Sequence, residues 1–132
     1  MMTTPAPLVS TGPIVLVIDD DPAVRSSLKF ALEIEGYSVR TFATGAELLK
    51  EKDIPEIGCL VADYYLPGIN GLDLLAALRE RHVKLPAILI TTHPNAGIRG
   101  RAAAAGVHLI EKPLLTDSLF QSIRAALGKA GQ

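Results

Sequence analysis

IVLVIDDD, residues 14–21, joins five consecutive apolar residues to three consecutive aspartates. A second run, GCLVA (58–62), ends in Asp63, and a third, VHLIE (107–111), ends at Lys112. Short apolar runs separated by segments with helical patterning are typical of parallel strands that are buried on both faces. The carboxyl ends of such strands lie at one edge of the sheet, where open α/β folds bind their ligands. We therefore expect the acidic residues and Lys112 to meet at that edge.

Clustered carboxylates repel one another unless a cation joins them. Two unit charges ~4 Å apart repel by roughly 4 kcal/mol at an effective dielectric constant near 20. A hard divalent ion removes this repulsion, and Mg²⁺ prefers a few carboxylates together with water and phosphate oxygens. The aspartates therefore predict a Mg²⁺ site that handles a phosphoryl group. Without metal, like-charge repulsion should raise the pKa of at least one of the carboxyl groups.

The size and charge of the chain narrow the classes of protein it can belong to. Its 132 residues are enough for one domain with a real core, and a net charge of −1 gives no sign of nucleic-acid binding. Cys59 lies within an apolar run, so we interpret it as a buried, unreactive thiol. No apolar run approaches the ~20 residues of a membrane span. Residues 1–13 lack the features of a signal peptide, so we expect a flexible segment there and a cytoplasmic protein.

Extended and helical patterns alternate along the chain. Strands are predicted over 14–18, 37–42, 58–62, 86–91 and 107–111, with the second at an edge, and helices over 22–35, 44–52, 72–82, 95–105 and 116–127. Asp21 is placed to cap the first helix, where Pro22 fits the first turn, and Gly106 should end the fourth. Five such units in succession predict a single α/β domain whose parallel sheet is covered by helices on both faces.

Four features in this order resemble the receiver domain of two-component response regulators. They are the pair Asp19-Asp20 after the first strand, Asp63 before the turn LPGING (66–71), Thr91 at the end of the fourth strand, and Lys112-Pro113 after the fifth. The resemblance covers residue 14 to about residue 127. It implies a flavodoxin-like (βα)5 doubly wound sandwich with a five-stranded parallel sheet of order 2-1-3-4-5. The receiver domain would span residues 14–128 and be followed by a tail at 129–132.

The resemblance also implies a metal site beside a phosphoacceptor. Asp63 would take a phosphoryl group from a phosphohistidine, forming an aspartyl phosphate. Asp20 would bind Mg²⁺ directly and Asp19 mainly through water. Asp63 itself and the backbone carbonyl of Tyr65 would complete the metal shell, and the metal would neutralise charge on the transferring group.

Two further residues are implied to act on the phosphoryl group. Lys112 would place a positive charge against one phosphoryl oxygen. Thr91 would donate its hydroxyl to another and move when phosphate arrives. The peptide bond between Lys112 and Pro113 is expected to be cis, which would aim the lysine inward.

The function implied by the resemblance is a phosphorylation-dependent signalling switch. A sensor histidine kinase or a phosphotransfer protein would phosphorylate it, and a changed face would bind a downstream protein or a fused output domain. The domain would catalyse only its own phosphorylation and dephosphorylation, and it would contact neither nucleic acid nor membrane. It would be a standalone regulator or a receiver excised from a longer one, and a monomer or a phosphorylation-dependent dimer.

Two enzyme-related folds and one non-catalytic function remain as alternatives. A phosphatase of the haloacid dehalogenase type also uses an aspartate nucleophile, but it usually has a second aspartate two residues later, where this chain has Tyr65. A flavodoxin would need a phosphate loop rich in Ser, Thr and Gly after the first strand, where residues 19–21 would instead repel phosphate. A degenerate receiver would act only as a protein-binding module, and the complete set of site residues argues against it.

The chain departs from the family pattern near the expected output surface. The family often has an aromatic residue three positions before the lysine, and here that position holds Leu109. The segment from Thr91 to Lys112 is short, and Gly97 and Gly100 lie in the predicted fourth helix, where glycine costs about 1 kcal/mol relative to alanine. We therefore expect phosphorylation to act through Thr91 and the loop and helix after it, with Leu109 as a fixed apolar floor.

Several polar residues near the predicted site have simpler explanations. Asp21 is better explained as a helix cap than as a metal ligand, and strand alternation should turn Glu111 away from Lys112 toward solvent. His93 either borders the site or is an ordinary loop residue, and the other two histidines are expected to be structural or exposed. Tyr65 either packs against its neighbours or shades the acyl phosphate from water.

Overall fold

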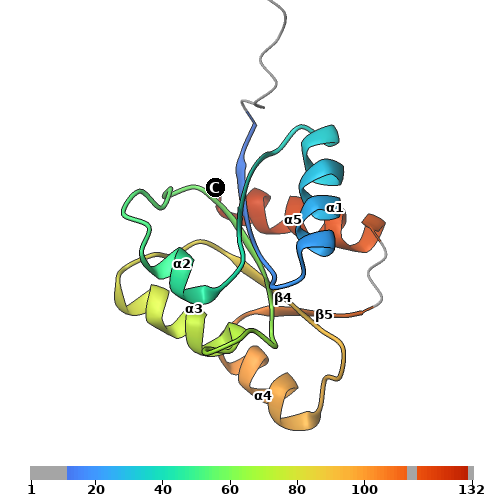
Figure 1. Ribbon diagram of the computed structural model, residues 1–132. Helices are drawn as coiled ribbons and strands as arrows, with labels where there is room; N and C mark the ends of the chain where they lie inside the picture. Colours follow the sequence, from blue (N-terminus) through green and yellow to red (C-terminus); the bar gives the residue numbers. More distant parts are fainter. Residues whose placement is uncertain (1–11, 113–115, 131–132) are drawn as a thin grey trace, which may run out of the picture.

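Within residues 12–112 and 116–130, which the computed structural model describes, five parallel strands form a sheet and each is followed by a helix (Figure 1). In chain order the elements are β1 (Ile14–Ile18), α1 (Pro22–Ile34), β2 (Ser38–Phe42), α2 (Gly45–Leu49), β3 (Gly58–Asp63), α3 (Gly71–Glu80), β4 (Ala87–Thr91), α4 (Ala96–Ala104), β5 (His108–Glu111) and α5 (Thr116–Ala130). The strand order β2-β1-β3-β4-β5 confirms the predicted topology and places β2 at an edge.

The sheet separates two apolar clusters, and β1 contributes alternate residues to each. Leu16 and Ile18 belong to the cluster that α2, α3 and α4 cover, whereas Val15 and Val17 belong to the cluster beneath α1 and α5 (Figure 1). Because the central strands are buried on both faces, their sequences are continuously apolar, as predicted. Cys59 lies in the second cluster, where burial raises the pKa of its thiol to about 12, consistent with an unreactive residue.

The helix starts follow the capping residues that the sequence offers. The side chain of Asp21 accepts the N–H of Ala23 at the start of α1, so this predicted cap is confirmed. Thr44 caps α2 by accepting the N–H of Glu47. Asn70 and Asn95 cap α3 and α4 in the same way. Each cap satisfies a backbone N–H that has no partner inside the helix.

Three predicted helix ends were wrong by two or three residues. α2 ends at Leu49 instead of Lys52, because the N–H of Glu51 bonds the carbonyl of Leu48 and tightens the last turn. α3 ends at Glu80 instead of His82. α5 continues to Ala130, beyond the predicted end at residue 127, and therefore enters the predicted tail; alanine and lysine favour helix there despite Gly128.

The C-termini of α1, α3 and α4 end in the same backbone motif. In each, the residue after the cap has a positive φ, at Gly36, His82 and Gly106, and the next N–H reaches back to a carbonyl in the last turn. Glycine adopts this conformation without strain, so Gly36 suits the end of α1, and Gly106 ends α4 as predicted. His82 has φ 64° and an exposed side chain, so this histidine is held in a conformation that L-residues disfavour.

We predict that His82→Gly stabilises the protein by about 0.5–1 kcal/mol. Glycine removes the strain energy of the left-handed backbone at residue 82. This gain is larger than the stability that is lost because glycine gives the unfolded chain more conformational entropy. Urea unfolding measures the difference. Gly106→Ala is the matched control, because a Cβ there meets nothing within 4 Å and only the backbone strain changes. The control should lose about 1 kcal/mol, and a His82→Gly variant less stable than the wild type would contradict the argument.

Candidate functional site

The strand order brings the predicted site residues to one edge of the sheet. β1 pairs with β3 so that Ile18 lies opposite Ala62, and the next residues, Asp19 and Asp63, are therefore neighbours at the carboxyl ends. Asp20 joins them: one carboxylate oxygen from each of the three aspartates lies within 4.8 Å of the others. The prediction that the acidic residues meet at this edge is confirmed.

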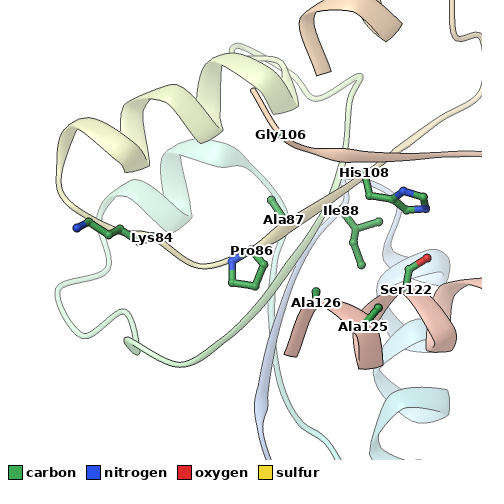
Figure 2. Close-up of a pocket in the computed structure, with 9 residues that line it drawn as sticks. All are labelled: Lys84, Pro86, Ala87, Ile88, Gly106, His108, Ser122, Ala125 and Ala126. Atoms are coloured by element: carbon green, nitrogen blue, oxygen red, sulfur yellow. The ribbon is translucent and has the colours of Figure 1, made fainter. Parts of the chain in front are cut away.

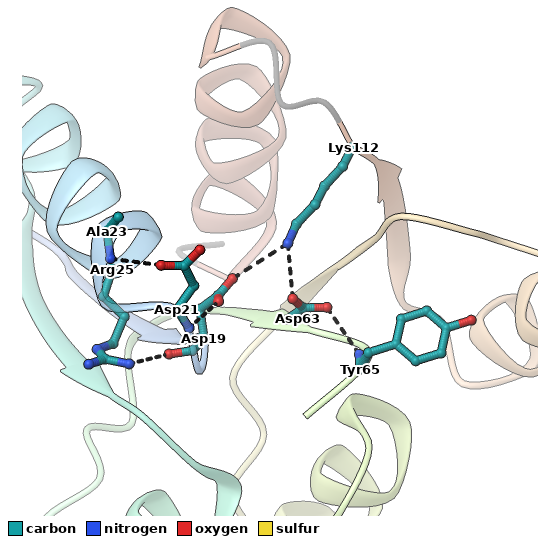
Figure 3. Close-up of polar contacts among 7 residues, drawn as sticks. All are labelled: Asp19, Asp21, Ala23, Arg25, Asp63, Tyr65 and Lys112. Carbon is teal, nitrogen blue, oxygen red and sulfur yellow. Dashed lines mark hydrogen bonds and ion pairs between the residues drawn. The ribbon is translucent and has the colours of Figure 1, made fainter. Parts of the chain in front are cut away.

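Asp63 is held from two sides, as Figure 3 shows. The backbone N–H of Tyr65 donates to its Oδ1 at 3.0 Å, and Lys112 Nζ donates to its Oδ2 at 3.0 Å. The side chain of Asp63 is nearly buried, whereas that of Lys112 is about one-quarter exposed. The carboxylate is therefore fixed in orientation and balanced by a lysine that comes from the end of β5.

Asp19 is more deeply buried and less well paired. Its Oδ1 accepts the N–H of Asp21 at 2.9 Å, and its Oδ2 lies 3.8 Å from Lys112 Nζ. Among the described residues this Oδ2 has no hydrogen-bond partner. A buried carboxylate oxygen without a donor, beside the oxygens of Asp20 and Asp63, is a donor set that fits a hard divalent cation.

The electrostatics of the pocket follow from this packing. Burial raises the pKa of Asp19, and the charges of Asp63 and Asp20 raise it further, against the lowering effects of the Asp21 N–H and Lys112. The expected raised pKa is present, but burial is a larger cause than the like-charge repulsion we expected. Burial lowers the pKa of Lys112, but the hydrogen bond with Asp63 and the nearby carboxylates outweigh it, so the pKa of Lys112 is raised and the lysine stays protonated.

Thr91 ends β4 beside the site. It is fully buried, and its hydroxyl has no hydrogen-bond partner among the residues that the structure describes. Its carbonyl accepts the N–H of Lys112 at 2.8 Å, which ties the end of β4 to the lysine. A buried hydroxyl without a partner is unfavourable by itself and is free to donate to a group that arrives at Asp63.

Two supporting residues were not found from the sequence. Arg25, on the first turns of α1, donates from Nη1 to the carbonyl of Asp19 at 2.7 Å and holds the acidic loop (Figure 3). Gly71 starts α3 where a Cβ would lie 2.9 Å from the carbonyl oxygen of Asp63. The six-residue spacing from Asp19 could have indicated Arg25, whereas the close approach at Gly71 depends on how the turn folds back.

The remaining polar residues mostly match their simpler explanations. Asp21 caps α1, and Glu111 is exposed and lies 3.6 Å from the Arg99 guanidinium, turned away from the site. His108 is exposed. His93 borders the site through its backbone, because its carbonyl accepts the hydroxyl of Tyr65 at 3.2 Å.

Leu109 occupies the position where the family often has an aromatic ring. It lies opposite Leu89 in the pairing of β4 with β5, and it is partly buried against the cluster that contains Ala102 of α4. This packing agrees with the expected apolar floor beneath α4. The expected cis bond at Lys112–Pro113 involves Pro113, which lies outside the described residues, as does most of the predicted flexible segment, residues 1–11.

A hollow lies at the opposite end of the sheet from the acidic cluster (Figure 2). It is a groove of about 440 Å³ between the amino ends of β4 and β5 and the second half of α5, with Lys84, His108 and Ser122 on its polar side. None of the described residues that line the groove carries a carboxylate. The groove is therefore separate from the acidic edge, and none of the three clustered aspartates lines it.

The fold and the site together define a class: a doubly wound α/β domain with three aspartates and a lysine at the carboxyl ends of its strands. Residues 15–124 match the family model of the response regulator receiver domain. The chain belongs to this family, and it is a receiver domain of two-component signalling.

Several regulators contain a similar sequence. The chain is 40% identical over 116 residues to the C4-dicarboxylate transport transcriptional regulatory protein DctD of Pseudomonas aeruginosa, covering 86% of this chain and 25% of that protein. It is 36% identical to the transcriptional regulatory protein FixJ of Azorhizobium caulinodans, covering 89% of this chain and 56% of that protein. The chain thus spans between a quarter and somewhat over half of these two relatives.

Solved structures share the fold. A CheY-like receiver domain from Methanospirillum hungatei superposes with a TM-score of 0.83 at 28% identity, covering 92% of this chain and 98% of that one. The receiver protein TrrA of Thermotoga maritima, solved in complex with Mg²⁺ and BeF, gives a TM-score of 0.75 at 27% identity, covering 87% and 99%. Among the described residues of our chain, none of the helices is long and apolar enough to cross a membrane.

We predict that Asp19→Asn makes the metal-free protein more stable at pH 7. The raised pKa of Asp19 means that the folded state binds more protons than the unfolded state in the window from about 3.8, the unfolded value, up to the raised value. Stability therefore falls as the pH rises through this window and remains lowered above it. The variant removes this loss.

Urea unfolding in the presence of chelator tests the Asp19 prediction. The advantage of Asp19→Asn should be full at pH 7 and shrink as the pH is lowered toward 4. Asp20→Asn is the matched control, because Asp20 is exposed and should change stability less. Equal stability of Asp19→Asn and the wild type at pH 7 would show that burial does not disfavour this carboxylate.

Proposed function

We propose that this domain is a phosphorylation-dependent switch whose phosphoacceptor is Asp63. The observation that carries the proposal is the placement of Asp63, with one oxygen on the N–H of Tyr65 and the other on Lys112. In the reaction, an Asp63 oxygen attacks the phosphorus of a phosphohistidine. The P–N bond breaks, and the histidine leaves with the electron pair and takes up a proton.

A Mg²⁺ ion fits the acidic cluster. Asp20, Asp63 and the backbone carbonyl of Tyr65 would bind it directly, and Asp19 would bind mainly through water. The ion would neutralise charge on the transferring phosphoryl group. The unpartnered Oδ2 of Asp19 supports this proposal, as does the complex of Mg²⁺ and BeF that a family member, TrrA, forms.

Lys112 and Thr91 would contact the transferred group. Lys112 already bonds Asp63 Oδ2, so a phosphoryl group arriving there meets a protonated amine. The unpartnered hydroxyl of Thr91 would donate to a second phosphoryl oxygen. A dehalogenase-type phosphatase is less well supported, because Tyr65 stands where it needs a second acid, and the ring points away from Asp63 (Figure 3).

The partners follow from the family. A sensor histidine kinase or a phosphotransfer protein would supply the phosphoryl group, and the domain would catalyse only its own phosphorylation and dephosphorylation, in the cytoplasm. The two relatives named above are transcriptional regulators, and both are longer than the matched region, which covers 25% of DctD and 56% of FixJ. We infer that phosphorylation of the receiver domain, residues 14–128, controls a downstream protein or a fused output domain.

Asp63 should take up phosphate in a Mg²⁺-dependent way. Incubation with acetyl phosphate should give a phosphorylated adduct, detected by intact mass, in Mg²⁺ and not in chelator. Asp20→Ala should abolish both the adduct and the stabilisation by metal. At a Mg²⁺ concentration ten times its Kd, that stabilisation is about 1.4 kcal/mol, because the ion binds the folded cluster and not the unfolded chain.

Asp63→Asn is the matched variant for this experiment, since asparagine keeps the shape of the side chain and lacks the nucleophile. A wild-type yield of adduct in Asp63→Asn would place the phosphoryl group elsewhere and would refute the proposal. A melting temperature indifferent to millimolar Mg²⁺ would show that the cluster does not bind the ion.

Phosphorylation should act through Thr91 and α4, with Leu109 fixed. When the phosphoryl group attracts the Thr91 hydroxyl, residues 92–96 follow and α4 repacks over Leu109. The change is a shift between two existing states, so its size is set by the contacts that the phosphate makes in each. Leucine gains about 1.5–3 kcal/mol from full burial, so it has no reason to move outward as an aromatic residue with a polar group could.

Amide hydrogen exchange with and without beryllofluoride measures this change. We expect altered protection over residues 92–105, lost in Thr91→Ala and little changed in Leu109→Ala after correction for lost stability. Unchanged exchange over the whole segment would leave α4 without a part in the response.

A further inference from the structure

Tyr65 connects two loops on opposite sides of the phosphoacceptor. Its backbone N–H bonds Asp63 Oδ1 at 3.0 Å, and its hydroxyl donates to the carbonyl of His93 at 3.2 Å. Its ring meets the ring of Tyr64 edge-on, with 4.8 Å between centroids and an interplanar angle of 86°. The Tyr65 side chain therefore spans from the loop after β3 to residues 92–95, the loop between β4 and α4.

The neighbouring ring limits where the Tyr65 ring can lie. Tyr64 is partly buried against the cluster on the α3 side of the sheet, so it gives the exposed ring of Tyr65 a fixed edge to rest on. Figure 3 shows the Tyr65 ring directed away from Asp63 and Lys112. In this position the ring does not cover the Asp63 carboxylate, and its hydroxyl donates to the carbonyl of His93 in the loop after Thr91.

That loop is the segment that has to move if Thr91 responds to phosphate. His93 is two residues from Thr91 and two from Asn95, whose side chain caps α4 by accepting the N–H of Ile98. A bond to the His93 carbonyl therefore holds the connection between the buried hydroxyl and the helix. Leu109 cannot supply such a restraint, because its side chain has no polar atom.

We propose that Tyr65 is a positioning residue that latches residues 92–95 in the resting state, and that movement of Thr91 toward a phosphoryl group breaks the latch. The proposal rests on the proposed phosphorylation of Asp63. It assigns to the residue two positions after the phosphoacceptor the reporting role that Leu109 cannot perform. The Tyr65–His93 bond then opposes switching, and its loss favours the switched state by the same factor.

Tyr65→Phe tests the latch, because it keeps the ring and removes only the hydroxyl. In the resting protein, amides of residues 92–98 should exchange about 2- to 10-fold faster than in the wild type, the range that one net hydrogen bond supplies. With Mg²⁺ and beryllofluoride the two proteins should exchange alike. The variant should also bind beryllofluoride more tightly, by up to the same factor. Tyr64→Phe is the matched control and should change neither quantity.

Each outcome separates the latch from the function on which it rests. Unchanged resting exchange in Tyr65→Phe would overturn the latch while leaving phosphorylation of Asp63 intact. Faster exchange with unaltered or weaker beryllofluoride binding would show that the bond does not oppose switching, and this would also overturn the proposal. Failure of the wild type to form an adduct with acetyl phosphate would instead refute the phosphoacceptor function, and with it any coupling through Tyr65.

Discussion

The contact between Lys112 and Asp63 is the interaction on which the rest of the site depends. Three carboxylates converge where β1 and β3 end, and two of them are nearly buried. Lys112 Nζ lies 3.0 Å from Asp63 and 3.8 Å from Asp19, and it arrives from β5, two strands away from β3. Without this cation, the packing that buries Asp19 would leave two negative charges side by side in a poorly solvated pocket.

Lys112 only partly neutralises the negative charge of the pocket. One amine faces three carboxylates, and Oδ2 of Asp19 still lacks a hydrogen-bond donor among the described residues. The resting pocket therefore carries an excess of negative charge. Under the proposed function, the added negative charge of a phosphoryl group would require a metal ion to accompany it. The proposed coupling of phosphate to Mg²⁺ would therefore be a consequence of the charge balance in the pocket.

The sequence was sufficient for the sheet and the convergence of the acids, and insufficient for the contacts made around them. Continuous apolar runs predict strands that are buried on both faces. The aspartates and the lysine that follow these runs predict the edge of the sheet at which the site lies. The helix ends at Leu49 and Glu80 depend on which carbonyl accepts the last N–H, which residue type alone does not specify. The bond from Tyr65 to His93 joins residues 28 apart, and neither residue has a pattern that predicts the other.

α4 is held to the rest of the domain by few buried side chains. Within it only Ile98 and Ala102 are buried, and its ion pairs, Arg99–Glu111 and Arg101–Asp73, join side chains that are more than half exposed. Exposed pairs contribute roughly 0–1 kcal/mol each and weaken in salt. The neutral bond from Tyr65 to the loop before α4 adds about 0.5–1.5 kcal/mol, whereas a hydrogen bond from Thr91 to a charged phosphoryl group contributes about 1.5–3 kcal/mol.

These magnitudes decide which contacts give way. The proposed hydrogen bond from Thr91 to a phosphoryl group would be similar in size to the latch and the two ion pairs of α4 together. It could therefore displace them, but not the apolar contacts of Leu109 or of the buried strands. Under the proposed mechanism, a balance this close would keep both states populated, and small changes in the restraints on α4 would shift the population that a partner meets. Leu109 on β5 is therefore compatible with signalling under this proposal, because Tyr65, which already contacts the phosphoacceptor, would restrain the loop before α4.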